Sequence, residues 1–353
     1  MKKIFILITL FACFFLSNIL VIAQNSLPFE SYQGIVVDSK GNVFASHNRK
    51  LVKITPDKKA IVYAGKPDEN AHKDGKGTEA LFDGLHGITI DKADNIYAAD
   101  YNCIRKIAAD GVVTTIAGNE RNSVIKDGDR NTASFRQVEH ITIDNIGNIY
   151  VTDEGVIINT QQTRYNVIRK ITPEGIVSTL KNKMDGSEIR LNAARGIACD
   201  KDNNVLVSDL GSRCIKKITP DGIVTTIAGK CDLQKYNPIY KEGNIQSATL
   251  VTPGDIAVSK NGDIYFSDSR LNRIIKIANS KVITVAGNSK IVLHVNIGGY
   301  SEGGYADGNA KLALFHEPLG IAFDAAGNLY IADFENKCIR KISPDGIVST
   351  LCK

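Results

Sequence analysis

Residues 87–118 read GITIDKADNIYAADYNCIRKIAADGVVTTIAG, and residues 320–352 read GIAFDAAGNLYIADFENKCIRKISPDGIVSTLC. The two stretches place their apolar runs, aspartates and turn residues in the same order. Four further stretches repeat that order, and the six copies begin at Gly34, Gly87, His140, Gly196, Asp255 and Gly320. An apolar residue stands five positions before each start: Phe29, Phe82, Phe135, Leu191, Leu250 and Phe315. Such repetition predicts a fold built from one supersecondary unit used six times.

Each copy holds four short runs rich in Ile, Val, Thr and Tyr, which is typical of β-strands. Gly, Asn, Asp and Pro separate the runs and favour tight turns, so the recurring aspartates are interpreted as turn residues: Asp38, Asp91, Asp144, Asp200, Asp324, and the Asp-Gly pairs at 74–75, 127–128 and 307–308. Because a lone four-stranded sheet cannot bury both faces, the copies must pack against one another. The sequence therefore predicts an all-β, six-bladed β-propeller of four antiparallel strands per blade.

The repeated pattern resembles the NHL repeat. Its elements are Gly-Ile-x-x-Asp, Gly-Asn-x-Tyr-x-x-Asp, Ile-Arg-Lys-Ile, Pro-Asp-Gly and Thr-x-Ala-Gly, and the resemblance covers residues 29–353. It implies the propeller fold. The family includes scaffold and ligand-binding domains, RNA-binding domains and a peptide-amidating lyase, so the resemblance leaves the chemistry open.

The first 23 residues have the features of a secretory signal peptide. Lys2 and Lys3 precede an apolar run over residues 4–15, and Ala23 ends the segment at a small residue. A membrane anchor is the alternative, but the apolar run is shorter than the roughly 20 residues that span a bilayer. We expect cleavage near Ala23, no membrane span in the mature chain, and an exported protein that is periplasmic, cell-surface or secreted.

The charge balance argues against a nucleic-acid partner. The chain has 43 Lys and Arg against 38 Asp and Glu, for a net charge of +5, and two of the positive charges lie in the leader. A nucleic-acid-binding domain would concentrate basic residues on one face.

The lengths of the connections between strands predict which face of the propeller carries the functional surface. The turns between the first and second strands and between the third and fourth stay short in every copy. The segments 153–168, 229–255 and 287–320 are long, and they all leave from the opposite face, because strand direction alternates within a blade. Function usually lies in variable loops, so we place the working surface on that face.

The residues at the channel mouth on that face can be predicted from the repeat. Those preceding the first strands are Gln33, His86, Glu139, Arg195, Gly254 and Leu319, with His140 in a place usually held by Gly. Those ending the second strands are His47, Asp100, Asp153, Asp209, Asp268 and Asp333, flanked on the loops by Tyr101, Tyr165 and Arg270. A concave mouth of mixed charge suits a small polar ligand or a peptide end. We therefore expect a binding or scaffold module for a protein, peptide or small polar ligand.

A metal-dependent lyase or hydrolase is the alternative. The amidating lyase of the family binds zinc through His at channel-side strand starts, and His86 and His140 resemble those positions. Catalytic zinc needs three protein ligands, and Glu139 is expected to point away from His140 because strand side chains alternate. The aspartates at the second-strand ends resemble the acidic zinc or calcium site of gluconolactonase-type propellers. Their recurrence in five copies favours a structural role in capping loop amides.

Six of the seven cysteines lie beyond the leader, which is compatible with disulfides in an oxidising compartment. Cys338 and Cys352 flank the turn at 344–346 and would face each other in a three-residue hairpin, although a slip of one residue would place them on opposite faces. Cys214 and Cys231 form the second candidate pair, at the top of the fourth blade. Cys103 and Cys199 are interpreted as core thiols.

Overall fold

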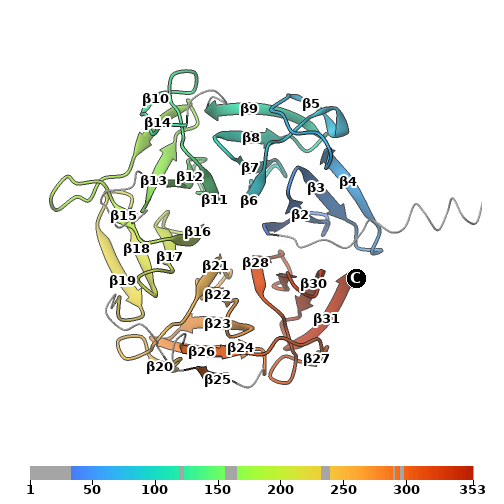
Figure 1. The fold of residues 1–353 in the computed structure, drawn as a ribbon, viewed down its shortest axis with the longest axis vertical. Coiled ribbons are helices and arrows are strands. Elements are labelled where there is room, and N and C mark those ends of the chain that lie inside the picture. The colour runs from blue at the N-terminus through green and yellow to red at the C-terminus, as the bar shows by residue number, and fades with distance from the viewer. Residues whose placement is uncertain are drawn as a thin grey trace, which may run out of the picture.

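The computed structural model describes residues 33–118, 123–155, 165–231, 239–288, 291–294 and 298–352. The expected signal peptide and Phe29 lie outside these residues. Figure 1 shows six sheets arranged around a central axis, with the first strand of each sheet innermost and the fourth outermost. The predicted six-bladed propeller is confirmed. Within the described residues, no helix is long and apolar enough to span a membrane.

Each blade is formed by consecutive strands in antiparallel order. Blade 1 holds β1 (Ile35–Val37), β2 (Val43–His47), β3 (Lys50–Ile54) and β4 (Ala60–Gly65). Blade 2 holds β6 (Leu85–Ile90), β7 (Ile96–Asp100), β8 (Cys103–Ile107) and β9 (Val112–Gly118). Blade 3 holds β11 (Val138–Ile143), β12 (Ile149–Glu154), β13 (Asn166–Ile171) and β14 (Ile176–Thr179).

The second half of the ring repeats this arrangement. Blade 4 holds β16 (Ala194–Cys199), β17 (Val205–Asp209), β18 (Cys214–Ile218) and β19 (Val224–Ala228). Blade 5 holds β21 (Pro253–Val258), β22 (Ile264–Asp268), β23 (Arg273–Ala278) and β24 (Lys281–Ala286). Blade 6 holds β28 (Pro318–Phe323), β29 (Leu329–Asp333), β30 (Cys338–Ile342) and β31 (Ile347–Cys352).

Four blades carry a short fifth strand that four strands per copy did not predict. These strands pair with the outermost strand of their blade: β5 (Gly75–Lys76), β10 (Gly128–Asp129), β20 (Gly243–Asn244) and β27 (Gly308–Asn309). The Asp-Gly pairs interpreted as turns therefore lead into edge strands. Three further elements lie in the connections: the 3-10 helix η1 (Gly77–Glu79), β15 (Arg190–Leu191), and the hairpin of β25 (Ile291–His294) with β26 (Gly298–Ser301).

The recurring aspartates form the first turns, as predicted. In blade 2, one carboxylate oxygen of Asp91 accepts hydrogen bonds from the backbone N–H groups of Ala93 and Asn95, each at 2.9 Å, and the other accepts one from the Asn95 amide. This pattern is an Asx-type turn, in which the side chain replaces a backbone acceptor. The two contacts from the Asn recur at Asp38, Asp144, Asp200 and Asp324.

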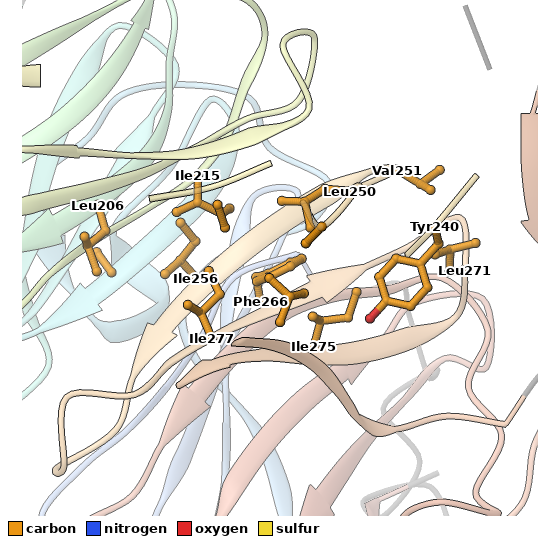
Figure 2. Close-up of a cluster of buried hydrophobic side chains, with 14 residues drawn as sticks. Leu206, Ile215, Tyr240, Leu250, Val251, Ile256, Phe266, Leu271, Ile275 and Ile277 are labelled. Atoms are coloured by element: carbon orange, nitrogen blue, oxygen red, sulfur yellow. The ribbon is translucent and has the colours of Figure 1, made fainter. Parts of the chain in front are cut away.

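The hydrophobic core consists of six clusters of described residues, one at each junction between neighbouring blades. Figure 2 shows the cluster between blades 4 and 5, where Leu206 and Ile215 lie near Phe266. The apolar residues that precede each copy are buried at these junctions: Phe82, Phe135, Leu191, Leu250 and Phe315. Blade 6 packs on blade 1 through a cluster that includes Ile35 and Ile339. Packing of side chains therefore closes the ring.

A buried arginine joins the elements of blades 2, 3 and 6. In blade 2, the Arg105 guanidinium donates to Asp100 at 2.7 Å and to Asp74 at 3.0 Å, and it also donates to the carbonyls of Lys73 and Leu81. The same contacts recur through Arg169 with Asp153 and Asp127, and through Arg340 with Asp333 and Asp307. We call this unit the arginine clamp. It ties the second strand and the fifth strand to the third.

One of the two predicted disulfides is present. Cys214 and Cys231 are joined, with their Cα atoms 5.3 Å apart. The Cys338–Cys352 pairing is wrong, because the strand register places Cys352 opposite Ile339. Side chains alternate along a strand, so this slip turns Cys338 to the other face of the sheet.

Candidate ligand site at the channel mouth

A β-bulge opens the innermost strand of blades 2 to 6 at the channel mouth. In blade 3, Val138 pairs with Asp153 and Ile141 pairs with Val151, so two residues of β11 oppose the single residue Thr152. Equivalent shifts occur in β6, β16, β21 and β28. Bulges leave residues unpaired and redirect their side chains.

The bulge corrects one expectation. Glu139 and His140 were expected to point in opposite directions, as in a regular strand, but both line the same cavity. The backbone N–H of His140 donates to the Thr152 hydroxyl at 3.1 Å. In blade 5, the N–H of Asp255 donates to the Ser267 hydroxyl at the same distance. The bulge leaves one N–H of the inner strand without a backbone acceptor on the second strand. A hydroxyl of the second strand accepts that hydrogen bond instead.

A cavity of about 400 Å³ lies at the mouth, where all six innermost strands begin. Seven of the predicted mouth residues line it: Gln33, His86, Glu139, His140, Arg195, Gly254 and Leu319. The lining also includes Leu210, Thr252, Pro253, Asp255 and Ser269. The polar side chains come mainly from blades 1 to 5, and blade 6 contributes an apolar wall.

The predicted ring of aspartates does not reach the cavity. Asp100, Asp153, Asp209, Asp268 and Asp333 are fully buried. They accept hydrogen bonds from loop amides, as Asp153 does from the N–H groups of Arg136 and Gln137 at 3.0 Å. The capping role that their recurrence favoured is confirmed, and their placement at the mouth is wrong.

The remaining predicted residues also lie outside the cavity lining. Tyr101 is exposed, and the Tyr165 ring stacks under Arg190 at 4.5 Å. The backbone carbonyl of Arg270 accepts a hydrogen bond from Ser301 of the β25–β26 hairpin, and the His47 ring contacts Asn48. In Figure 1 this hairpin lies at the outer edge of blade 5, so it does not roof the channel.

Asp255 is an ionisable lining residue that the sequence analysis did not select as a mouth residue. It occupies the position held by Gly in four copies, and these glycines let neighbouring inner strands approach closely. A Cβ on Gly320 would lie 2.2 Å from the carbonyl oxygen of Gln33. Only two copies depart from Gly at this position, with His140 and Asp255. That departure was the available signal for both residues.

Burial and mutual repulsion govern protonation in the cavity. Burial raises the pKa of Asp255 to about 7, although its carboxylate accepts a hydrogen bond from the Ile321 N–H at 2.9 Å. Burial, together with the charge of Arg195 and with His86, lowers the pKa of His140 to about 3. Burial also lowers the pKa of His86 and raises that of Glu139. Both imidazoles are therefore neutral at pH 7.

We expect Asp255→Asn to stabilise the protein, and to do so more at pH 8 than at pH 4.5. An unfolded Asp ionises near pH 3.8 and the folded Asp255 near pH 7. Between these values the folded state holds the proton that the unfolded state has released, so stability falls as pH rises. Asn avoids this loss, and its amide oxygen still accepts from Ile321.

Urea unfolding midpoints at the two pH values measure this effect. The control is Asp202→Asn, because the Asp202 side chain is 65% exposed and pairs with Lys201 on the surface. A benefit of Asp255→Asn that is the same at both pH values would contradict the expectation.

A second, larger hollow of about 620 Å³ lies between blades 2 and 3 on the opposite face. Turn residues such as Lys92, Asn145 and Pro173 line it, and it contains none of the predicted site residues. The mouth cavity is the stronger candidate, because there the sequence departs from the repeat.

The fold and the cavity define a six-bladed β-propeller with a polar site at one end of its channel. More specifically, one part of the chain matches a known repeat: the family model described as NHL repeat matches residues 315–342, within blade 6 and the segment that leads into it. The resemblance identified in the sequence is thereby confirmed.

Two curated relatives share part of their length with this chain. Protein SUPPRESSOR OF QUENCHING 1, chloroplastic, from Arabidopsis thaliana is 24% identical over 80% of this chain and 27% of its own length. Teneurin-4 from Mus musculus is 28% identical over 76% of this chain and 8% of its own length. The chain thus spans under a third of each protein.

Solved structures share the fold at low sequence identity. An auxiliary nutrient binding protein from Bacteroides thetaiotaomicron has a TM-score of 0.63 and 15% identity, with 91% of this chain and 69% of that chain covered. A gluconolactonase from Xanthomonas campestris has a TM-score of 0.55 and 13% identity, with 91% and 86% covered. Virginiamycin B lyase from Staphylococcus aureus has a TM-score of 0.50 and 16% identity, with 94% and 87% covered.

Proposed function

We propose that this propeller is an exported binding module that holds a small polar ligand or a peptide end in the mouth cavity. The observation that carries the proposal is the cavity itself. Its volume lies within the roughly 300–1,000 Å³ typical of small-molecule sites. It gathers ionisable side chains from blades 2 to 5 around a partly apolar wall, which is the composition of a ligand site.

The structural neighbours support a small ligand as the occupant. These neighbours are an auxiliary nutrient binding protein, a gluconolactonase and virginiamycin B lyase. The export that we propose rests on the leader at residues 1–23. We expect no nucleic-acid partner, because basic and acidic residues are nearly equal in number.

Filling the cavity tests the proposal. Leu319→Trp enlarges a side chain of the apolar wall and is expected to abolish binding of any ligand found by thermal-shift screening of metabolites, glycans, lactones and short peptides. Leu312→Trp is the matched control, because Leu312 is 67% exposed and lies outside the lining. A ligand that binds both variants equally well would show that the mouth cavity is not the site.

A metal-dependent lyase or hydrolase is the second candidate, favoured by one observation. His86 and His140 line the same cavity from adjacent blades, as the alternative requires. Among the described residues, no three His, Cys, Asp or Glu side chains are grouped closely enough to hold a metal ion. The two imidazoles therefore fit polar lining groups better than an assembled set of three ligands.

A further inference from the structure

Three charged groups of the cavity have no ion-pair partner among the described residues. The Arg195 guanidinium, the Glu139 carboxylate and the Asp255 carboxylate all line the space. None belongs to an ion pair within the described part of the chain. Glu139 has only a 3.5 Å contact from the Gln137 amide, and Asp255 accepts backbone N–H groups. Glu139 and Asp255 are partly buried, and a carboxylate withdrawn from water without an ionic partner is costly, whereas Arg195 is exposed at the mouth.

The order of the blades sets the arrangement of these charges. Arg195 projects from blade 4, Glu139 from blade 3 and Asp255 from blade 5, so the cation lies between two carboxylates around the ring. Burial raises the pKa of both carboxyls; the charge of Arg195 opposes the rise at Glu139 without offsetting it, and at Asp255 only backbone N–H groups oppose it. The neutral imidazoles of His86 and His140 add no charge to this balance.

We propose that the occupant of the mouth cavity is a zwitterion of amino-acid or dipeptide size, whose carboxylate binds Arg195 and whose ammonium group binds Glu139 and Asp255. This inference rests on the proposed function, because it names the ligand class of the same cavity. Arginine presents two parallel N–H donors that match a carboxylate. Leu210, Pro253 and Leu319 supply apolar surface for a side chain of the ligand.

Other ligand classes fit this charge arrangement less well. A simple anion would meet two carboxylates beside Arg195, and a simple cation would meet the guanidinium. A neutral ligand would exclude water from all three charges and satisfy none of them with an opposite charge. A zwitterion offers an opposite charge to each of the three groups and leaves the net charge of the cavity unchanged.

Calorimetric titration of the full-length protein tests the class. The protein amino acids and a set of dipeptides are titrated first, and the tightest binder is then compared with its C-terminal amide and its N-acetyl derivative. We expect each blocked derivative to bind at least about tenfold more weakly, which is the scale of one lost charge-assisted hydrogen bond. Comparison of the free amino acid with its dipeptides shows which of the two sizes fits.

Variants assign the two charges to their partners. Arg195→Gln is expected to remove the preference for the free carboxylate over the amide, and Glu139→Gln to reduce the preference for the free ammonium group. Arg130→Gln is the control, because Arg130 lies at the hollow on the opposite face. Each variant is first checked for an unchanged thermal midpoint.

Proton release gives a further readout. The ammonium group of a bound zwitterion favours the ionised form of Asp255, so binding near pH 7 is expected to release protons and to show heats that depend on the buffer. In Asp255→Asn this contribution is expected to vanish.

Three outcomes overturn the inference and remain distinguishable. If the blocked derivatives bind as tightly as the zwitterion, the charge assignment is wrong. If no zwitterion binds, but a neutral ligand from the thermal-shift screen binds and is lost in Leu319→Trp, the ligand class is wrong and the proposed function stands. If no ligand depends on Leu319, both fail.

Discussion

Replacing Arg169 by Met is expected to destabilise the propeller by about 3–5 kcal/mol, because it leaves a buried carboxylate without its cation. The Arg169 side chain is fully buried and donates to Asp153 and Asp127, each at 3.0 Å. It also donates to the backbone carbonyls of Lys126 and Ser134. Met fills a similar volume but satisfies none of these four acceptors.

Urea unfolding monitored by far-ultraviolet circular dichroism measures the loss. Lys201→Met is the control, because Lys201 pairs with Asp202 where both side chains are largely exposed. Such surface pairs contribute about 0–1 kcal/mol. If Arg169→Met unfolds at nearly the same urea concentration as this control, the arginine clamp does not stabilise blade 3.

Breaking the Cys214–Cys231 disulfide by Cys231→Ser is expected to cost about 3 kcal/mol, the loop-closure value for a bridge of this sequence separation. Blade 4 relies on this bond because it has no arginine clamp. Lys216 takes the place of the arginine and reaches Asp209 at 2.6 Å. No described fifth strand covers the outermost strand β19.

Thermal midpoints with and without a reducing agent test the role of the disulfide. The reductant is expected to lower the midpoint of the unaltered protein and to leave that of Cys231→Ser unchanged. An equal drop in both proteins would show that the reductant acts elsewhere in the chain.

The fold was predictable because the same pattern of strands and turns occurs six times in the sequence. Strand composition, turn residues and the apolar residue before each copy all point to the same blade, and consistency across such levels is what specifies one structure. Phe82 and Phe315, for example, were identified by spacing and are fully buried between blades. The Asx-type turns followed from residue type alone.

The site was predictable only in part. The repeat located the mouth residues, but strand alternation gave the wrong direction for Glu139, because a bulge is set by pairing with β12 and leaves no local signature in β11. The aspartates at the second-strand ends were interpreted partly as mouth residues, although the arginines that bind three of them recur at a fixed place in the third strand, in the motif Ile-Arg-Lys-Ile. Blade 1 lacks both partners of the clamp: it has His47 at the position of the Asp and Val52 at the position of the Arg.

The bulges on the inner strands separate the residues that hold the ring together from the residues that line the mouth cavity. The unpaired positions at the mouth add little to strand pairing, so an exchange there changes the lining and leaves the ladder intact. Each bulge has two positions, such as His86 and Gly87 in blade 2. Where Gly occupies the second, close packing leaves no room for a side chain, so only the first position can vary. If the proposed function holds, substitutions at these positions would alter the ligand site one blade at a time without disturbing the ring.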